Sequence, residues 1–372
     1  MRLKNKNLIL AVILGLGFIA LLIFWQDRQT FISNQFRGQS TPAEAVTIVV
    51  ENLEIPWDIA FLPGGDLLVT ERTGRLTRIS SSGERVEIPI NRVKSKGEGG
   101  LLGLVLHPDF SRNHLLYLYL TAPGEEGQTE NRVERYRLEG NKLVDEKLII
   151  GNIPGALYHD GGRMEFGPDG LLYITTGDAT KENLAQDRNS LAGKILRLKD
   201  DGQVPEDNPF GTPVYSYGHR NPQGLAWDDE GRLWATEHGR SGLLSGLDEI
   251  NLVQKGLNYG WPEIQGEETA PDMVSPVLQS GSDVTWAPAS LTYFKGRLFF
   301  GGLRGEALYE ARLEGNQIAE LKVHFKGEFG RIRTVRLGLD KMLYLTTSNR
   351  DGRGRPGAGD DKIIKISPAA LD

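Results

Sequence analysis

Hydrophobic and polar positions alternate along this chain in a unit that recurs six times. Each unit contains a short run of apolar strand formers, a tight turn with Gly, Pro, Asp or Lys, and a second such run. The turns centre near Pro63, Pro108, Pro168, Asp229, Lys295 and Asp340, and the gaps between them are 45, 60, 61, 66 and 45 residues. A pattern that returns at this spacing predicts a series of small antiparallel sheets.

The spacing of the units decides between two all-β architectures. A four-stranded propeller blade occupies about 40–45 residues, so the longer gaps indicate inserted loops. Six units predict a six-bladed β-propeller over residues 46–372. Val46–Val50 and Ile363–Ile366 are extra strands at the two ends, and pairing them in one blade would close the ring. A two-sheet sandwich is the competing fold, and six similar units fit it poorly.

The N-terminal region has a different pattern. Leu8–Trp25 is an unbroken apolar run of 18 residues that follows Arg2, Lys4 and Lys6. This length and charge predict a single membrane-anchoring helix within residues 1–25, with the rest of the chain outside the cytoplasm. A cleaved signal peptide is the alternative. Residues 26–45 are polar and aperiodic and predict a linker, so the propeller would be periplasmic and membrane-anchored, or else secreted.

Composition excludes several kinds of chemistry. The chain has no cysteine, so it forms no disulfide and has no thiolate metal site or cysteine nucleophile. Its formal charge is −6, with no basic run after residue 6, and nucleic acid is therefore not an expected partner. The 46 glycines suit many tight turns and argue against a helical protein.

Residues that could carry chemistry come shortly before the repeated units. His159 precedes a strand–turn–strand pattern, and Asp178 follows it, where it is placed to fold back towards the histidine. An ordinary loop histidine is the alternative interpretation. A shared position before the inner strands predicts that several such side chains surround one opening: Glu98, His159, Arg220, Arg331 and Arg333. Arginines gathered in an acidic chain indicate a polyanionic ligand.

Other motifs are absent or unremarkable. GEGGLLG lacks the third glycine and the following helix of a dinucleotide-binding loop, and no P-loop, G-x-S-x-G or H-E-x-x-H occurs. His107 and His114 are interpreted as turn and strand residues. His219 and His238 lie between glycines or beside one, and are interpreted as turn residues.

Several longer motifs resemble the glucose/sorbosone dehydrogenase family, the soluble quinoprotein glucose and aldose sugar dehydrogenases. They are GEGGLLGLVLHPDF, HDGGRMEFGPDG, LAGKILRL, YSYGHRNPQGLAW, TEHG and DEINLVQKGLNYGWP. The similarity covers residues 52 to about 366. It implies a six-bladed propeller that carries pyrroloquinoline quinone and calcium, which agrees with the repeat count.

The resemblance also implies roles for individual positions. His159 matches the general base, and Asp178 the residue that orients it. The cofactor-binding positions are Glu98, Arg220, Asn221, Arg304, Arg331 and Arg333, with Arg220 polarising the reactive carbonyl of the quinone. The carbonyls of Gly239 and Arg240 match ligands of the calcium beside the quinone, and Glu249 with the carbonyl of Tyr259 matches a second, structural calcium site.

This chain departs from the family pattern at positions beside the cofactor, at a substrate contact and in the calcium loop. Glu98 stands where the sugar oxidisers have Gln, Tyr158 replaces an acidic substrate contact, Arg240 replaces a Pro, and Ser241–Leu247 lengthen the calcium loop. Glu98 is also a rival base, because a carboxylate beside an anionic cofactor could have a raised pKa.

The sequence therefore predicts a quinone-dependent dehydrogenase that oxidises the C1 hydroxyl of an aldose and passes the electrons to an external acceptor. A propeller that only binds a ligand or a protein is the alternative, and a calcium-dependent lactonase is a third interpretation that the arginines argue against.

Overall fold

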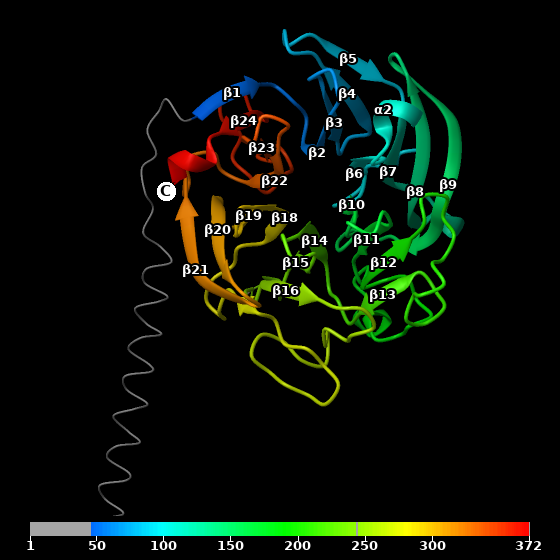
Figure 1. The fold of residues 1–372 in the computed structure, drawn as a ribbon, viewed down its shortest axis with the longest axis vertical. Coiled ribbons are helices and arrows are strands. Elements are labelled where there is room, and N and C mark those ends of the chain that lie inside the picture. Colours follow the sequence, from blue (N-terminus) through cyan, green and yellow to red (C-terminus); the bar gives the residue numbers. More distant parts are fainter. Residues whose placement is uncertain (1–45, 243–244, 372) are drawn as a thin grey trace, which may run out of the picture.

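The computed structural model describes residues 46–242 and 245–371, and these form six antiparallel four-stranded sheets arranged in a ring (Figure 1). The predicted six-bladed propeller is confirmed, and the sandwich is excluded. The innermost strands are β2, β6, β10, β14, β18 and β22; each is the first of its sheet in sequence except β22, whose sheet also contains the N-terminal β1.

The first three blades take the chain from residue 56 to residue 217. Blade 1 contains β2 (Pro56–Phe61), β3 (Leu67–Glu71), β4 (Arg75–Ile79) and β5 (Arg85–Ile88). Blade 2 contains β6 (Leu101–Leu106), β7 (Leu115–Pro123), β8 (Thr129–Glu139) and β9 (Lys142–Pro154). Blade 3 contains β10 (Met164–Phe166), β11 (Leu172–Thr176), β12 (Lys194–Leu198) and β13 (Val214–Tyr217).

The last three blades complete the ring. Blade 4 contains β14 (Pro222–Trp227), β15 (Leu233–Glu237), β16 (Glu249–Val253) and β17 (Leu278–Gln279). Blade 5 contains β18 (Pro288–Phe294), β19 (Arg297–Gly302), β20 (Ala307–Glu314) and β21 (Gln317–His324). Blade 6 contains β22 (Ile332–Leu337), β23 (Leu343–Thr347), β24 (Ile363–Ile366) and β1 (Val46–Val50). Short helical turns lie at α2 (Phe110–Asn113), η2 (Glu125–Gly127), η3 (Glu182–Ala185) and η5 (Pro368–Leu371).

The two ends of the domain meet in blade 6. β1 pairs antiparallel with β24, with Val46 opposite Ile366 and Thr47 opposite Lys365. The predicted closure of the ring by Val46–Val50 and Ile363–Ile366 is confirmed. Closure joins the first and last strands of the domain in one sheet, so that unfolding either end opens the ring.

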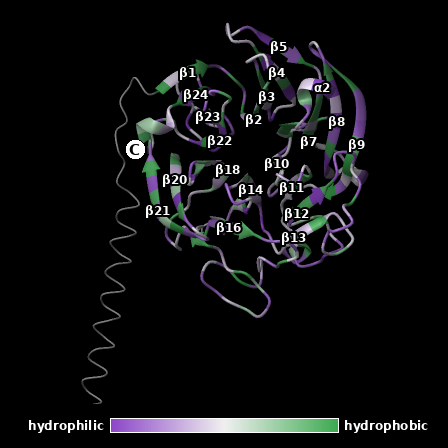
Figure 2. Cartoon of the chain, viewed as in Figure 1, coloured by the Kyte–Doolittle hydropathy of each residue, from purple (hydrophilic) through white to green (hydrophobic). Residues whose placement is uncertain are grey.

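The hydrophobic core lies between neighbouring blades. Inner strands such as β3 and β11 are buried on both faces, because each sheet packs against the sheet on either side. Outer strands such as β21 are buried over only part of their length, and Figure 2 shows both hydrophobic and hydrophilic residues along β21. Rigid, doubly packed inner strands hold the loops at their ends in fixed positions.

An ion-pair network fills the middle of the ring. Oδ2 of Asp58 in blade 1 lies 2.7 Å from Nη1 of Arg163, which directly precedes β10 of blade 3. Both side chains are fully buried. Arg336 of blade 6 also pairs with Asp58, and the Arg163 guanidinium lies 4.3 Å from the ring centre of Trp57. Asp58 thus connects blade 1 both to blade 3, which is not its neighbour in the ring, and to the adjacent blade 6.

The predicted membrane-anchoring helix and linker, residues 1–25 and 26–45, lie outside the described residues. Within the described part of the chain, no helix is long and apolar enough to cross a membrane.

Candidate active site

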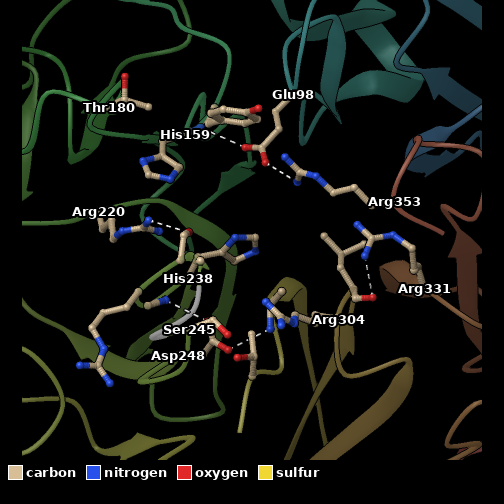
Figure 3. Close-up of a pocket in the computed structure, with 18 residues that line it drawn as sticks. Glu98, His159, Thr180, Arg220, His238, Ser245, Asp248, Arg304, Arg331 and Arg353 are labelled. Atoms are coloured by element: carbon tan, nitrogen blue, oxygen red, sulfur yellow. Dashed lines mark hydrogen bonds and ion pairs between the residues drawn. The ribbon is translucent and has the colours of Figure 1, made fainter. Parts of the chain in front are cut away.

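A pocket of about 450 Å³ opens on one face of the propeller (Figure 3). In an antiparallel blade, the loop before the first strand and the loop after the second strand lie at the same end. Both kinds of loop supply the lining. Seven of the predicted catalytic, cofactor and calcium positions line this pocket: Glu98, His159, Arg220, Gly239, Arg240, Arg304 and Arg331. A smaller cavity of about 20 Å³ shares Glu98 and His238 with it and reaches Arg333.

His159 and Asp178 form a hydrogen-bonded pair in this pocket. The distance between His159 Nδ1 and Asp178 Oδ1 is 2.7 Å. Asp178 is held in turn by the backbone N–H of Thr180 at 2.7 Å and by the indole N–H of Trp261 at 2.9 Å. An acceptor at Nδ1 places the imidazole proton on that nitrogen and leaves Nε2 free to accept a proton.

The backbone of His159 is in an unusual conformation for a residue with a side chain. Its φ is +64°, in the left-handed region. The carboxylate of Glu98 accepts the His159 N–H at 3.0 Å, and the N–H of Glu98 donates to the carbonyl of Leu157 at 2.9 Å. The two loops lie so close at Gly97 that a Cβ there would be 2.2 Å from the Leu157 oxygen. The strained conformation is thus fixed by a neighbouring loop, as is common at functional sites.

Glu98 is an ionised carboxylate with both oxygens engaged. Its second oxygen pairs with Arg353 Nη1 at 2.7 Å. Burial alone would raise the pKa of Glu98. The hydrogen bond from the His159 N–H, the electrostatic interaction with His238 and the ion pair with Arg353 together lower it to about 2. The expectation of a raised pKa at Glu98 is therefore wrong, and a group this acidic is a poor proton acceptor at neutral pH.

Three arginines around the pocket each have a buried guanidinium nitrogen that makes no hydrogen bond to the part of the chain that the structure describes. These atoms are Nε of Arg220, Arg240 and Arg333. Burial lowers the pKa of Arg333 to about 9, with a smaller contribution from the charges of Arg72 and Arg331 and against the opposing charge of Asp351. Burying unpaired positive charge is costly, so these groups favour the binding of an anion.

Arg331, in contrast, already has a carboxylate partner. Its Nη2 lies 2.8 Å from Asp351, and its Nη1 donates to the carbonyl of Leu303 at 3.0 Å. Arg304 lines the pocket from the turn after β19 and is exposed. The two residues predicted together as cofactor cations therefore differ: Arg304 is accessible, whereas Arg331 is held in place and neutralised.

Asn221 is fully buried and does not line either of these cavities. Its side-chain oxygen accepts the N–H of Gly161 at 3.1 Å, and its Nδ2 is buried without a partner. It follows Arg220 directly, in the loop before β14, and contacts the loop that carries His159 through Gly161. The structure thus gives Asn221 a supporting position below the pocket, with one free donor.

The predicted calcium carbonyls lie in the loop after β15. Gly239 and Arg240 both line the pocket, and Asp248 accepts the N–H of Gly239 at 2.9 Å. Burial raises the pKa of Asp248, although the N–H groups of Ala287, Gly239 and Trp286 all oppose this. Calcium prefers oxygen ligands, and this loop offers carbonyls beside a carboxylate.

The predicted second metal position is behind the pocket. Glu249 of β16 lies directly opposite Glu237 of β15 in the sheet, and burial together with Glu237 raises the pKa of Glu249 to about 8. Nδ1 of His219 is hydrogen-bonded to Oε2 of Glu237 at 2.8 Å. The imidazole stacks on the ring of Tyr259, with 4.8 Å between the ring centroids. Two carboxylates facing each other in a sheet repel, so the position fits a cation.

The sequence did not point to several residues that line the pocket, and His238 and Arg353 are the most informative of them. His238 was interpreted as a turn residue, but it lines both cavities, and burial lowers its pKa to about 3. Arg353 was not singled out. Both follow the second strand of a blade, as Asp178 and Arg304 do, and this shared place in the repeat is the sequence signal that points to them.

Fold and site together define a six-bladed propeller with a histidine–carboxylate pair beside a cluster of buried cations. The chain belongs to the glucose/sorbosone dehydrogenase family, whose profile matches residues 53–356. The resemblance found in the motifs is thus confirmed over most of the propeller.

Named relatives narrow the comparison. The aldose sugar dehydrogenase YliI of Escherichia coli is 32% identical over 357 residues, a match that covers 87% of this chain and 92% of that one. The PQQ-bound aldose sugar dehydrogenase of Streptomyces coelicolor is 41% identical with a TM-score of 0.80, covering 88% of this chain and 99% of that one. A putative glucose dehydrogenase structure from Thermus thermophilus is 43% identical with a TM-score of 0.81, covering 86% and 99%.

Proposed function

We propose that this protein is a quinoprotein dehydrogenase that oxidises the C1 hydroxyl of an aldose sugar to the lactone, using pyrroloquinoline quinone and calcium. The observation that carries the proposal is the meeting of a His159–Asp178 pair with buried, unpaired guanidinium groups in one pocket. The relatives named above supply the chemical identity of the cofactor.

The unpaired cations fit a cofactor with three carboxylates. Arg333, Arg220 and Arg304 are the groups we expect to hold it, with the Nδ2 of Asn221 as a further donor. Arg331 is expected mainly to shape the cofactor site as a fixed lining residue, because Asp351 already compensates its charge. Glu98 adds a carboxylate on this side, but its charge is compensated by Arg353.

Pyrroloquinoline quinone, when bound, supplies the acceptor for the hydride that leaves the sugar carbon, and calcium beside it strengthens that acceptor. The chain must take the hydroxyl proton. His159 has a free Nε2 facing the pocket, and Asp178 fixes its tautomer and stabilises the imidazolium after proton transfer. Arg220 is expected to polarise the reactive carbonyl, because its guanidinium lies in the same pocket.

Calcium is proposed at two positions. The first uses the carbonyls of Gly239 and Arg240 and lies in the pocket. The second uses Glu249 and the carbonyl of Tyr259, where the facing carboxylates of Glu249 and Glu237 favour a cation. Both positions offer the hard oxygen ligands that calcium prefers.

A propeller that only binds a ligand or a protein is the other candidate, and one feature of the pocket speaks against it. Binding alone needs neither a histidine with a free Nε2 nor a carboxylate that holds it. A lactonase would not need the buried arginines, since a lactone is neutral. We further propose an extracytoplasmic location and an external electron acceptor, which rest on the N-terminal sequence and on the chemistry of the reaction.

Reconstitution tests the proposal directly. Apo protein is mixed with pyrroloquinoline quinone and calcium, and a panel of aldoses and simple alcohols is assayed with an artificial electron acceptor. We expect calcium-dependent turnover of aldoses and a lactone product. Tight quinone binding without turnover of any sugar would refute the proposed substrate, and failure to bind the quinone would refute the proposed cofactor.

A further inference from the structure

Three residues at the mouth of the pocket form a cluster that the proposed reaction does not use. Arg353, from the loop between β23 and β24, pairs with Glu98 at 2.7 Å. Its guanidinium carbon lies 5.3 Å from the ring centre of Tyr158, which comes from the loop that carries His159. Glu98 in turn accepts the His159 N–H at 3.0 Å. Figure 3 shows Glu98 between His159 and Arg353.

The cluster holds the Arg353 guanidinium in one orientation. An ion pair on one edge and an aromatic ring at its face restrict a side chain that would otherwise move freely. The guanidinium has five N–H donors, and the contact with Glu98 uses Nη1 alone. Arg353 lines the pocket while its side chain is 51% exposed, so donors remain for a molecule that enters.

Arg353 differs from the other pocket arginines in how its charge is compensated. Arg220, Arg240 and Arg333 have buried nitrogens without partners and attract an anion, as argued above for the cofactor. Arg353 is compensated one-to-one by Glu98, so the mouth of the pocket beside His159 is close to neutral. Donors in fixed positions without net charge suit a neutral polyhydroxyl ligand better than an anion.

We propose that Arg353, held by Glu98 and Tyr158, is a specificity-determining residue that donates hydrogen bonds to hydroxyl groups of the sugar and, because Glu98 compensates its charge, selects neutral sugars over acidic ones. This inference rests on the proposed function and names the substrate class of the same pocket.

The preference follows from what an acidic sugar would have to displace. A sugar carboxylate that paired with Arg353 would either pull the guanidinium away from Glu98 or bring two carboxylates together. The first leaves Glu98, which also holds the His159 N–H, without its counter-charge, and the second adds repulsion in a partly buried site. A hydroxyl group accepts from the free N–H groups and disturbs neither contact.

The experiment compares pairs of sugars that differ mainly in charge. The holoenzyme is assayed with glucose and glucuronate, and with galactose and galacturonate. The variants are Arg353→Met and Glu98→Gln, and Arg355→Met on the same exposed loop is the control. Thermal unfolding confirms that each variant is folded, and quinone titration measures its cofactor affinity.

We expect the parent to prefer each neutral sugar over its uronic acid. Arg353→Met should raise KM for the neutral sugar by about tenfold, the loss of one or two hydrogen bonds, with a smaller change in kcat and in quinone affinity. Glu98→Gln leaves Arg353 positively charged, so KM for the uronic acid should fall relative to KM for the neutral sugar. Arg355→Met should match the parent.

Three results would overturn the proposal: an unchanged KM in Arg353→Met, an unchanged neutral-to-acidic ratio in Glu98→Gln, or a loss of quinone affinity in Arg353→Met as large as the change in KM. Failure of the proposed function is distinguishable, because the parent would then bind quinone and oxidise no sugar. In that case, saturation-transfer NMR compares the binding of glucose and glucuronate to the parent and the variants. This comparison tests the role of Arg353 without requiring turnover.

Discussion

Nδ1 of His159 lies 2.7 Å from Oδ1 of Asp178, a residue 19 positions further along the chain. The β10–β11 hairpin separates the two in sequence, and its antiparallel strands return Asp178 to the face where His159 precedes β10. Asp178 is nearly fully buried and is held by Thr180 and Trp261, so it is a fixed acceptor for the imidazole. The pair has the geometry of an oriented general base.

Replacing the imidazole tests this role. We expect His159→Gln to lower kcat by roughly 10²–10⁴, the usual contribution of a positioned base. The quinone should still bind, because the arginines that meet it are untouched. Steady-state turnover and quinone titration measure the two effects separately.

Glu98→Gln is the matched comparison, since Glu98 was the rival base. Its carboxylate has a pKa of about 2 and both oxygens are engaged, so we expect a much smaller loss of kcat than in His159→Gln. A His159→Gln enzyme with near-parental turnover, beside an inactive Glu98→Gln enzyme, would reverse the assignment.

The sequence was sufficient to predict the fold because the repeat is a local pattern and the closure of the ring follows from the number of repeats. Turn chemistry at Pro168 and Asp229 and strand formers on either side mark each hairpin without reference to the rest of the chain. The strands Val46–Val50 and Ile363–Ile366 were found with their observed bounds. Closure followed because a propeller leaves no other partner for two single strands at its ends.

The site was predicted less completely, because charge and burial depend on contacts between loops. Position in the repeat was enough to bring Glu98, His159 and Arg220 to one pocket. It could not show that Arg331 is neutralised by Asp351, nor that Arg353 lowers the pKa of Glu98. The first property depends on a contact within blade 6 and the second on a contact between loops of blades 2 and 6, and no spacing in the sequence encodes either contact.

Quinone affinity should depend more on Arg333 than on Arg331. Arg333→Met removes a buried cation without a carboxylate partner, and a lost charge-assisted hydrogen bond costs about 1.5–3 kcal/mol. Arg331→Met should weaken binding less, since its charge is already paired, while destabilising the fold by leaving Asp351 alone. Titration of apo protein followed by quinone absorbance measures the affinities, and the opposite ranking would contradict this assignment of the two residues.

Removal of calcium should lower the melting temperature as well as activity. A ligand that binds the native state alone stabilises it by mass action, about 2.7 kcal/mol at a hundredfold excess over Kd. Thermal unfolding is compared in calcium, in magnesium and in excess chelator.

Glu249→Gln is the variant that tests the second calcium position. It removes one of the two facing carboxylates, so calcium should raise its melting temperature less than it raises that of the parent. Identical melting curves for the parent in calcium and in chelator would count against both proposed positions.

The low pKa of Glu98 predicts a specific acid sensitivity. A carboxyl group whose pKa is about 2 in the folded protein and near 4.5 in the unfolded chain stabilises the fold above pH 4.5. That contribution is lost as the pH falls from 4.5 towards 2. The difference in unfolding free energy between the parent and Glu98→Gln should therefore narrow by about 1.4 kcal/mol for each pH unit in this range.

Urea unfolding at pH 7, 4.5 and 3.5 measures the narrowing. Glu84→Gln, at an exposed turn, is the control and should show a smaller pH dependence of its difference from the parent. If the difference in unfolding free energy between the parent and Glu98→Gln stays constant from pH 7 to pH 3.5, the contacts of Glu98 with His159 and Arg353 do not lower its pKa.

The ion pair at the axis should be the most costly to break. Asp58 is fully buried; burial opposes its ionisation, but the charges of Arg163 and Arg336 outweigh that and lower its pKa. Asp58→Ala leaves the fully buried Arg163 without its carboxylate, and breaking one side of such a pair costs about 3–5 kcal/mol. Asp109→Ala, which breaks a surface pair with Arg112, should cost no more than about 1 kcal/mol. Urea midpoints measure both variants. Since Asp58 joins blades 1, 3 and 6 across the ring, its loss should weaken the propeller as a whole, and equal midpoints for the two variants would show that packing between neighbouring blades alone holds the ring closed.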